Sequence, residues 1–240
     1  MTQMLLQPVV LPKTPRYREV AYRAIKEAIL DGRLEPEQPL VEEKLASLLN
    51  ISRTPVREAL ALLEHERLIG TRGGRRLHVR IITRNEFVEM FVANETVEPY
   101  LARRAALRAT DKQLEEVKSA IERGQESATR ADIAGFLRSG RDFHRLVGIA
   151  SGNTPLTQFV VRNEERTDLY LLSYGKVVNQ FMMQASNREH EAIFEAISRR
   201  DPEAAARLVI YHTQSLRERF SELFNDGQTE GEENNDEAKQ

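Results

Sequence analysis

Three of the five histidines lie in the second half of the 240-residue chain, at His144, His190 and His212, and each falls within a segment of helical apolar spacing. Neutral imidazole is a good ligand for a divalent metal ion, and helical bundles build metal sites by bringing such side chains together from several helices. Spacing alone does not show whether the three rings meet. A divalent metal site and three separately hydrogen-bonded histidines both remain open.

A second group of side chains is suited to binding nucleic acid. Arg53 and Arg57 are four residues apart in a predicted helix and so share one face, where their guanidinium groups can bind phosphates or the edge of guanine. Ser52 and Thr54 add hydroxyl groups at the same end of that helix. The alternative is that these are solvated arginines on an exposed helix.

A basic hairpin is predicted directly after this helix. Apolar residues at 68–69 and 77–81 alternate as in strands and flank a turn that contains Arg72, Gly73, Gly74 and Arg75. The two glycines would let the backbone approach a duplex closely. Helix, turn, helix and basic hairpin is the order of a winged helix-turn-helix, whose second helix reads the major groove.

The elements that must position these side chains are mostly helical. In the first 80 residues the pattern predicts helices over 16–31, from about 41 to 50, and from 52–55 onward. Their apolar markers are, respectively, Val20, Ala24, Ala28 and Leu30; Val41, Leu45, Leu48 and Leu49; and Val56, Leu60 and Leu63. Asp31-Gly32 ends the first helix, and Pro55 fits the first turn of the third.

From Thr83 onward only helices and breaks are indicated. The predicted helices are 84–109, 111–128, 132–150, 155–173, 179–199 and 203–224, with start signals at Thr83, Thr110-Asp111, Thr154-Pro155 and Asp201-Pro202. The predicted fold is mostly α, with an N-terminal winged helix-turn-helix over 16–82 and an antiparallel all-helical bundle over 83–224. Residues 1–15 are interpreted as a flexible arm and 225–240 as a disordered acidic tail.

The near-neutral charge hides an uneven distribution. The chain has 35 Lys and Arg against 37 Asp and Glu, yet residues 1–80 hold 14 basic and 10 acidic side chains. The absence of cysteine excludes disulfides, thiolate metal sites and a cysteine nucleophile. Apolar runs fall short of the ~20 residues of a membrane-spanning helix, so we expect a cytoplasmic protein with no membrane contact.

The stretch ILDGRLEPEQPLVEEKLASLLNISRTPVREALALLEHERLI resembles the signature of the GntR family of bacterial transcription regulators over about residues 18–80. The resemblance implies that Arg53 and Arg57 contact operator DNA, that Thr54 assists at the phosphates, and that the hairpin tip enters the minor groove. Two positions depart from the family pattern. Asn50 replaces the usual turn glycine, which Asn tolerates, and Glu43 replaces a basic residue, so that contact is not carried over.

The segments RDFHRLV at 141–147 and NREHEAIFEAISRRDPEAAARLVIYHTQ at 187–214 resemble the FCD domain of the FadR subfamily within that family. The resemblance implies a metal held by an Asp and three His that match 144, 190 and 212. Position 140 is Gly here, and Asp142 cannot replace the Asp because two residues turn a helix by ~200°. In addition, Asn94 and Glu95 stand one turn before Glu98, where many members that bind organic acids carry an Arg.

The resulting hypothesis is a homodimeric, DNA-binding transcription repressor whose bundle binds a small effector, namely a carboxylate metabolite that uses a divalent metal. Its partners would be double-stranded operator DNA and that effector. One alternative is a regulator whose metal-free bundle only dimerises. Another is a zinc-dependent hydrolase, but no nucleophile elbow, phosphate-binding loop, dinucleotide fingerprint or HExxH occurs, so we expect no enzyme.

Overall fold

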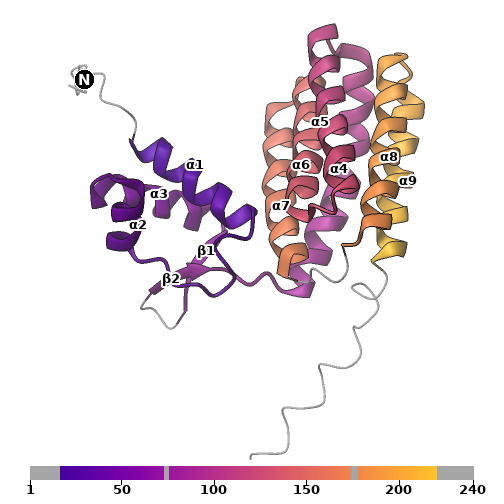
Figure 1. Ribbon diagram of the computed structural model, residues 1–240. Helices are drawn as coiled ribbons and strands as arrows, with labels where there is room; N and C mark the ends of the chain where they lie inside the picture. The colour runs from indigo at the N-terminus through magenta and orange to yellow at the C-terminus, as the bar shows by residue number, and fades with distance from the viewer. Residues whose placement is uncertain (1–16, 73–75, 174–177, 221–240) are drawn as a thin grey trace, which may run out of the picture.

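The computed structural model describes residues 17–72, 76–173 and 178–220, which form nine helices and one two-stranded sheet. Three helices and the sheet lie on one side, and six long helices form a bundle on the other (Figure 1). The order of elements agrees with the prediction of a mostly α protein. The predicted arm at 1–15 and the acidic tail at 225–240 lie outside the described residues.

The N-terminal part has the element order of a winged helix-turn-helix. It contains α1 (Tyr17–Leu30), α2 (Glu42–Leu49), α3 (Arg53–His65), β1 (Ile69–Arg72) and β2 (Arg76–Val79). The strands are antiparallel, with Ile69 opposite Val79 and Arg72 opposite Arg76. The predicted hairpin is therefore present, whereas its Gly73-Gly74 turn and Arg75 lie outside the described residues.

The turn between α2 and α3 depends on one residue with a left-handed backbone. Asn50 has φ 52° and ψ 45°, and its N–H donates to the carbonyls that end α2. Asn adopts this conformation more readily than most residues, which confirms that it can replace glycine here. Helix α3 then begins after Ser52 and buries Val56 and Leu60 against the other helices.

The buried faces of α1 and α2 leave out two of the apolar residues whose spacing predicted these helices. Val20 is 52% exposed and Leu48 is 72% exposed, so neither belongs to the core. Helix α1 instead packs through Ala21, Ile25 and Ile29, a stripe shifted by one residue. A one-residue shift turns a helix by about 100°, and a helix with apolar residues on two faces does not reveal which face is inside.

The bundle consists of six helices joined by short loops: α4 (Arg84–Arg108), α5 (Asp111–Thr129), α6 (Ile133–Ser151), α7 (Thr154–Ser173), α8 (Gln180–Ser198) and α9 (Pro202–Arg219). Three of the four start signals acted as predicted, whereas α7 begins at Thr154 itself and is capped by Asn153. Thr83 and Thr110 each form a capping box, and Asp201 caps α9 with Pro202 in the first turn. Residues 221–224, the predicted end of the last helix, lie outside the described residues.

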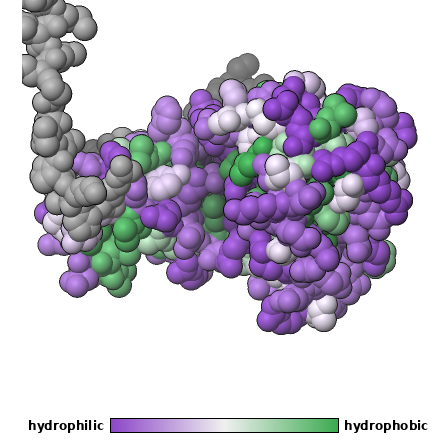
Figure 2. All heavy atoms as spheres, turned by 90° about the horizontal axis from the view of Figure 1, so that it is seen from above, coloured by the Kyte–Doolittle hydropathy of each residue, from purple (hydrophilic) through white to green (hydrophobic). Residues whose placement is uncertain are grey.

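Two apolar cores hold the structure together. One continues from α1 and α3 into the near end of the bundle, where Phe87 and Tyr170 stack with ring centroids 4.5 Å apart. The other fills the far half of the bundle with small and aliphatic side chains such as Ala105 and Ile197. The bundle surface seen in Figure 2 is mostly hydrophilic, with hydrophobic groups in separate spots. Within the described residues, no helix has the length and apolarity to cross a membrane.

Candidate nucleic-acid interface and candidate metal centre

The two predicted DNA-contacting arginines occupy the first turns of α3 and face solvent. The side chains of Arg53 and Arg57 are 59% and 65% exposed. Ser52 is the exposed N-cap residue and makes no capping hydrogen bond through its side chain within the described residues, and Thr54 is exposed beside it. Donors from all four residues are therefore presented at one end of a short helix, the arrangement that groove-reading helices use.

A carboxylate that sequence reasoning missed holds one of these arginines. Arg57 donates through Nε and Nη2 to Glu42 of α2, with distances of 3.0 Å for Nε to Oε1 and for Nη2 to Oε2. Arg53 Nη2 lies 3.9 Å from the same carboxylate. The hydrogen bonds from Arg57 lower the pKa of Glu42. This forked pairing fixes the plane of the Arg57 guanidinium before any ligand arrives. Because the residues are distant in sequence, no pattern pointed to the pair.

The remaining predicted DNA contacts lie in the hairpin. Arg72 ends β1, but its side chain and residues 73–75 fall outside what the structure describes. The backbone of the two strands shows that this segment is the tip of the hairpin.

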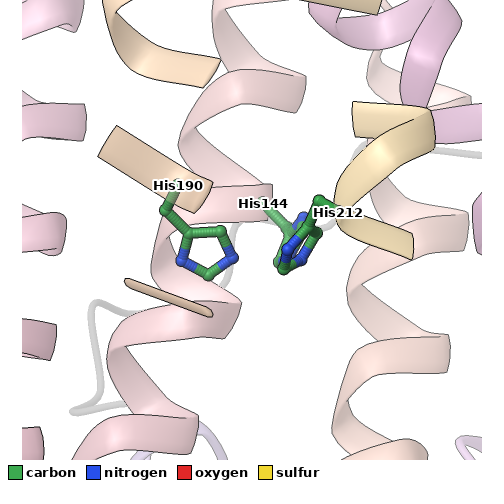
Figure 3. Close-up of side chains that lie close together, drawn as sticks. All are labelled: His144, His190 and His212. Atoms are coloured by element: carbon green, nitrogen blue, oxygen red, sulfur yellow. The ribbon is translucent and has the colours of Figure 1, made fainter. Parts of the chain in front are cut away.

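The three histidines come together inside the bundle. His144 lies on α6, His190 on α8 and His212 on α9, and their ligand nitrogens all lie within 4.8 Å of one another. Figure 3 shows the three rings turned toward a common space. The ring centroids of His190 and His212 are 4.7 Å apart and those of His144 and His190 are 5.1 Å apart. The structure thus brings together residues whose convergence the sequence left open.

Contacts with carboxylates through Nδ1 orient two of the three rings and leave their Nε2 atoms available. His144 Nδ1 lies 3.1 Å from Glu98 Oε2, and His212 Nδ1 lies 2.7 Å from Glu189 Oε2. His190 Nε2 is buried and has no hydrogen-bond partner among the described residues. A carboxylate bound to one ring nitrogen is the usual way to fix a metal-binding histidine, and a buried unpartnered nitrogen is costly without a ligand. The donor set therefore fits a divalent metal ion.

Position 140 borders this centre, as the resemblance implied. A Cβ built on Gly140 would meet only His190 Cε1 within the described residues, at 3.9 Å. Asp142 turns to the other side, where its carboxylate contacts Arg123 and Arg145. Asp142 thus does not replace the absent carboxylate at 140.

Burial and neighbouring charge shift the pKa values of the three rings in different directions. Burial opposes protonation of His144, but the carboxylates of Glu98 and Glu164 outweigh it and raise its pKa to about 9. Burial lowers the pKa of His190 well below its usual value and also lowers that of His212. At neutral pH the metal-free centre therefore holds one charged ring beside two neutral ones.

A cavity of about 80 Å³ adjoins the histidines. Besides the three histidines, its ionisable lining within the described residues consists of the carboxylates of Glu98, Glu164 and Asp168 and the guanidinium of Arg141. Arg141 donates to Asp168. Burial raises the pKa of Glu164 to about 7 and that of Asp168 to about 6. The polar wall of the cavity is thus acidic, which the sequence did not indicate.

Asn94 and Glu95, which stand where many FCD members carry an Arg, take different places. Asn94 is buried at the cavity, where it donates to Glu164 at 2.6 Å and accepts a hydrogen bond from Asn163 at 3.1 Å. Glu95 pairs with Arg217 instead. Asn94 therefore occupies the cavity wall as a neutral hydrogen-bonding group.

Helix α7 connects this cavity with the N-terminal part. It supplies Glu164 and Asp168 to the cavity wall, and between them Glu165 lies 2.8 Å from Lys26 of α1. The next residue of the same helix, Arg166, pairs with Glu86 at the start of α4. In Figure 1, α7 is the bundle helix nearest to α1. The same helix therefore lines the cavity in the bundle and contacts the first helix of the N-terminal part.

Comparison with known proteins gives two family matches. Residues 17–79 match "Bacterial regulatory proteins, gntR family", and residues 89–215 match the FCD domain. The chain is 31% identical to the HTH-type transcriptional repressor NanR of Enterobacter sp. (strain 638) over 75% of both chains. It is 25% identical to the HTH-type transcriptional repressor RspR of Escherichia coli (strain K12), covering 92% of this chain and 95% of RspR. The solved structure of E. coli McbR/YncC shares the fold, with a TM-score of 0.76 and 19% identity over 88% of this chain and all of that one.

Proposed function

The chain belongs to the GntR family of DNA-binding transcriptional regulators and carries an FCD effector-binding domain, and we propose that it is a repressor released by a small carboxylate-bearing effector. Relatives named as repressors, NanR and RspR, support the direction of control. The family consists of regulators rather than enzymes, so the hydrolase alternative is set aside. We place its action in the cytoplasm, where bacterial operator DNA lies.

On the DNA side, Arg53 and Arg57 would contact bases or phosphates of operator DNA, with Ser52 and Thr54 at the phosphates. Arg72, Gly73, Gly74 and Arg75 would follow the adjacent groove from the hairpin. This assignment rests on the exposure of the first four residues at the start of α3. Two-fold operators require two reading helices about one turn of DNA apart, so the active form would be a homodimer.

The DNA assignment is tested by fluorescence anisotropy with the DNA upstream of the gene. We expect the Arg53→Ala, Arg57→Ala double variant to lose specific affinity. The slope of the logarithm of affinity against the logarithm of salt concentration should also become shallower, by about one for each phosphate contact removed. Arg103→Ala is the matched control, because Arg103 is also exposed but pairs with Glu203 on the bundle. Undiminished affinity in the double variant would refute the assignment.

In the bundle, His144, His190 and His212 would hold one zinc, nickel or manganese ion through Nε2. The observation that carries this proposal is the convergence of the three rings, two of which contact a carboxylate through Nδ1 while the third has a buried Nε2 with no partner among the described residues. When bound, the ion supplies positive charge and open coordination positions that suit a carboxylate. An effector changes the DNA-binding state only as far as it binds the two states with different affinity.

The domain limits follow the same division. We propose a DNA-binding domain over 16–82 and an effector-binding and dimerisation domain over 83–224. Effector binding would act on α7, whose residues line the cavity and contact α1 through Glu165 and Lys26. A change in the position of α7 would then alter how the reading heads are held.

The metal proposal is tested by elemental analysis of the full chain purified without a histidine tag. We expect about one equivalent of zinc, nickel or manganese, lost in His190→Ala. His65→Ala is the matched control, since His65 is an exposed histidine at the end of α3. Absence of metal in the unaltered chain would favour the alternative, a bundle that only dimerises.

A further inference from the structure

The cavity beside the histidines contains more negative charge than a simple carboxylate effector would require. Three carboxylates and one guanidinium line it within the described residues, and Arg141 is already paired with Asp168. Glu98 is occupied by His144. Glu164 differs from these two because, among the described residues, the hydrogen-bond partner of its carboxylate is the neutral amide of Asn94, at 2.6 Å. Glu164 is therefore the carboxylate that retains acceptor capacity for a ligand.

A second polar group at the same wall lacks a partner. Thr167, one helical turn along α7 from Glu164, is only 7% exposed and lines the cavity, yet its Oγ1 makes no hydrogen bond among the described residues. Buried hydroxyl groups without a partner are uncommon because desolvation is then uncompensated. A ligand that donates a hydrogen bond to Glu164, or forms one with Thr167, would supply the partner that these polar groups lack.

Charge balance distinguishes the possible ligands. A divalent ion on the histidines would favour the ionised form of the nearby carboxylates, and its charge and that of Arg141 would then together equal those of the three carboxylates in the cavity wall. A monocarboxylate would then bury one uncompensated negative charge, which is costly in a low-dielectric interior. A molecule that carries both a carboxylate and a protonated amine adds no net charge. The small volume of the cavity, about 80 Å³, favours a molecule of few atoms.

We infer that the effector is a small amino acid, whose ammonium group binds Glu164 on α7 while its carboxylate occupies the metal-bearing side of the cavity. The inference rests on the proposed function and narrows the class of carboxylate that it names. The apolar wall, which includes Phe136 and Leu171, would contact a short apolar side chain. Because Glu164 adjoins Glu165, an ammonium bound there lies on the helix that contacts Lys26 of α1.

The test uses pairs of probes of the same shape in which an amine replaces a hydroxyl group. L-Alanine is compared with L-lactate, and L-valine with L-2-hydroxyisovalerate, by titration calorimetry on the full chain loaded with Zn²⁺. Unfolding temperatures at equal probe concentrations give an independent readout. In at least one pair we expect the amino acid to bind about ten- to hundredfold more tightly, the range of a charge-assisted hydrogen bond.

Two variants locate the preference. Glu164→Gln retains the shape of the side chain and an acceptor for Asn94, and we expect it to bring the affinity ratio within each pair close to one while the bound Zn²⁺ is unchanged. Glu195→Gln is the matched control on the exposed face of α8, where Glu195 pairs with Arg199, and it should leave the ratio unchanged.

The outcomes separate the two levels of the proposal. Hydroxy acids that bind as tightly as the amino acids, or a preference that survives Glu164→Gln, would overturn the amino acid inference and leave the proposed function standing. Failure of both classes of probe to bind, or of the chain to hold Zn²⁺, would overturn the proposed metal-dependent effector site and this inference with it.

Discussion

Lys26 of α1 and Glu165 of α7 form an ion pair between the N-terminal part and the bundle, with 2.8 Å between Nζ and Oε2 and side chains that are 15% and 10% exposed. Lys26 also contacts Glu66 at 2.9 Å. Burial opposes its charge, but the carboxylates raise the pKa of Lys26 above its usual value, so the ammonium remains charged. The cavity-lining helix α7 is thereby tied directly to the first helix of the DNA-binding part.

Removal of this ammonium should destabilise the protein more than removal of its partner. In Lys26→Met the two carboxylates of Glu66 and Glu165 lose their shared cation, and we expect a loss of about 2–4 kcal/mol in the free energy of unfolding. Adding Glu165→Gln to that variant should restore part of the loss, because one of the stranded charges is removed. Urea unfolding measures the cycle, and strictly additive effects would contradict a direct coupling.

Glu42 should determine how selectively the protein reads DNA. In Glu42→Gln the guanidinium of Arg57 loses its ionic partner and its fixed orientation. We expect the ratio of specific to non-specific affinity to fall by about tenfold, within the range of one oriented arginine–base contact. Removal of a negative charge near DNA should at the same time strengthen non-specific binding.

Glu43→Gln is the matched control for Glu42→Gln. Glu43 is the neighbouring exposed carboxylate on α2. Its replacement by Gln removes the same charge without altering the contact between Glu42 and Arg57. Anisotropy with operator and random DNA measures both ratios. An equal ratio of specific to non-specific affinity in the two variants would mean that Glu42 acts only through its charge.

An aspartate at position 140 should strengthen metal binding. The space beside His190 Cε1 admits a side chain there, and a carboxylate would add a ligand to the three imidazoles. We expect Gly140→Asp to bind Zn²⁺ at least about tenfold more tightly in competition with a chelator, the size of effect that single metal-site groups produce. Gly140→Asn supplies the same shape without the charge. If both variants bind alike, the added carboxylate does not reach the ion.

Zinc binding near pH 7 should release about one proton. His144, whose pKa is raised to about 9, is charged in the metal-free protein, whereas a metal binds the neutral ring. Affinity should therefore rise with pH up to about 9. Calorimetry in buffers of different ionisation enthalpy counts the proton, and Glu98→Gln should reduce the count because it removes a carboxylate that favours the charged ring. A buffer-independent enthalpy would contradict this prediction.

The same shift fixes how the metal-free protein responds to pH. A histidine whose folded pKa is raised above its unfolded value of about 6.5 contributes stability that is complete below that pH. This contribution is lost as the pH rises through about 9. We therefore expect the unfolding temperature of the metal-free protein to fall across that interval, and the fall to be smaller in His144→Gln.

The sequence by itself determined the order and ends of the elements. Thr83, Thr110 and Asp201 start their helices because a cap bonds to backbone N–H groups within the next three residues. Asn50 ends α2 through its own backbone conformation. The run SRTPVREAL was equally local, since it lies in one helix and its preceding turn. Such features depend on interactions within a few residues, so the pattern contains what is needed to predict them.

Only the tertiary structure decided which side chains meet. The convergence of His144, His190 and His212, the clamp of Glu42 on Arg57, and the acidic cavity wall all join helices far apart in the chain. Each contact depends on how far a helix is rotated and displaced against its neighbours, and a one-residue error turns a side chain by about 100°. The exposure of Val20 shows that apolar spacing can reveal a helix without revealing which of its faces is buried. Packing of the whole bundle resolves that rotation, because only one arrangement fills the core.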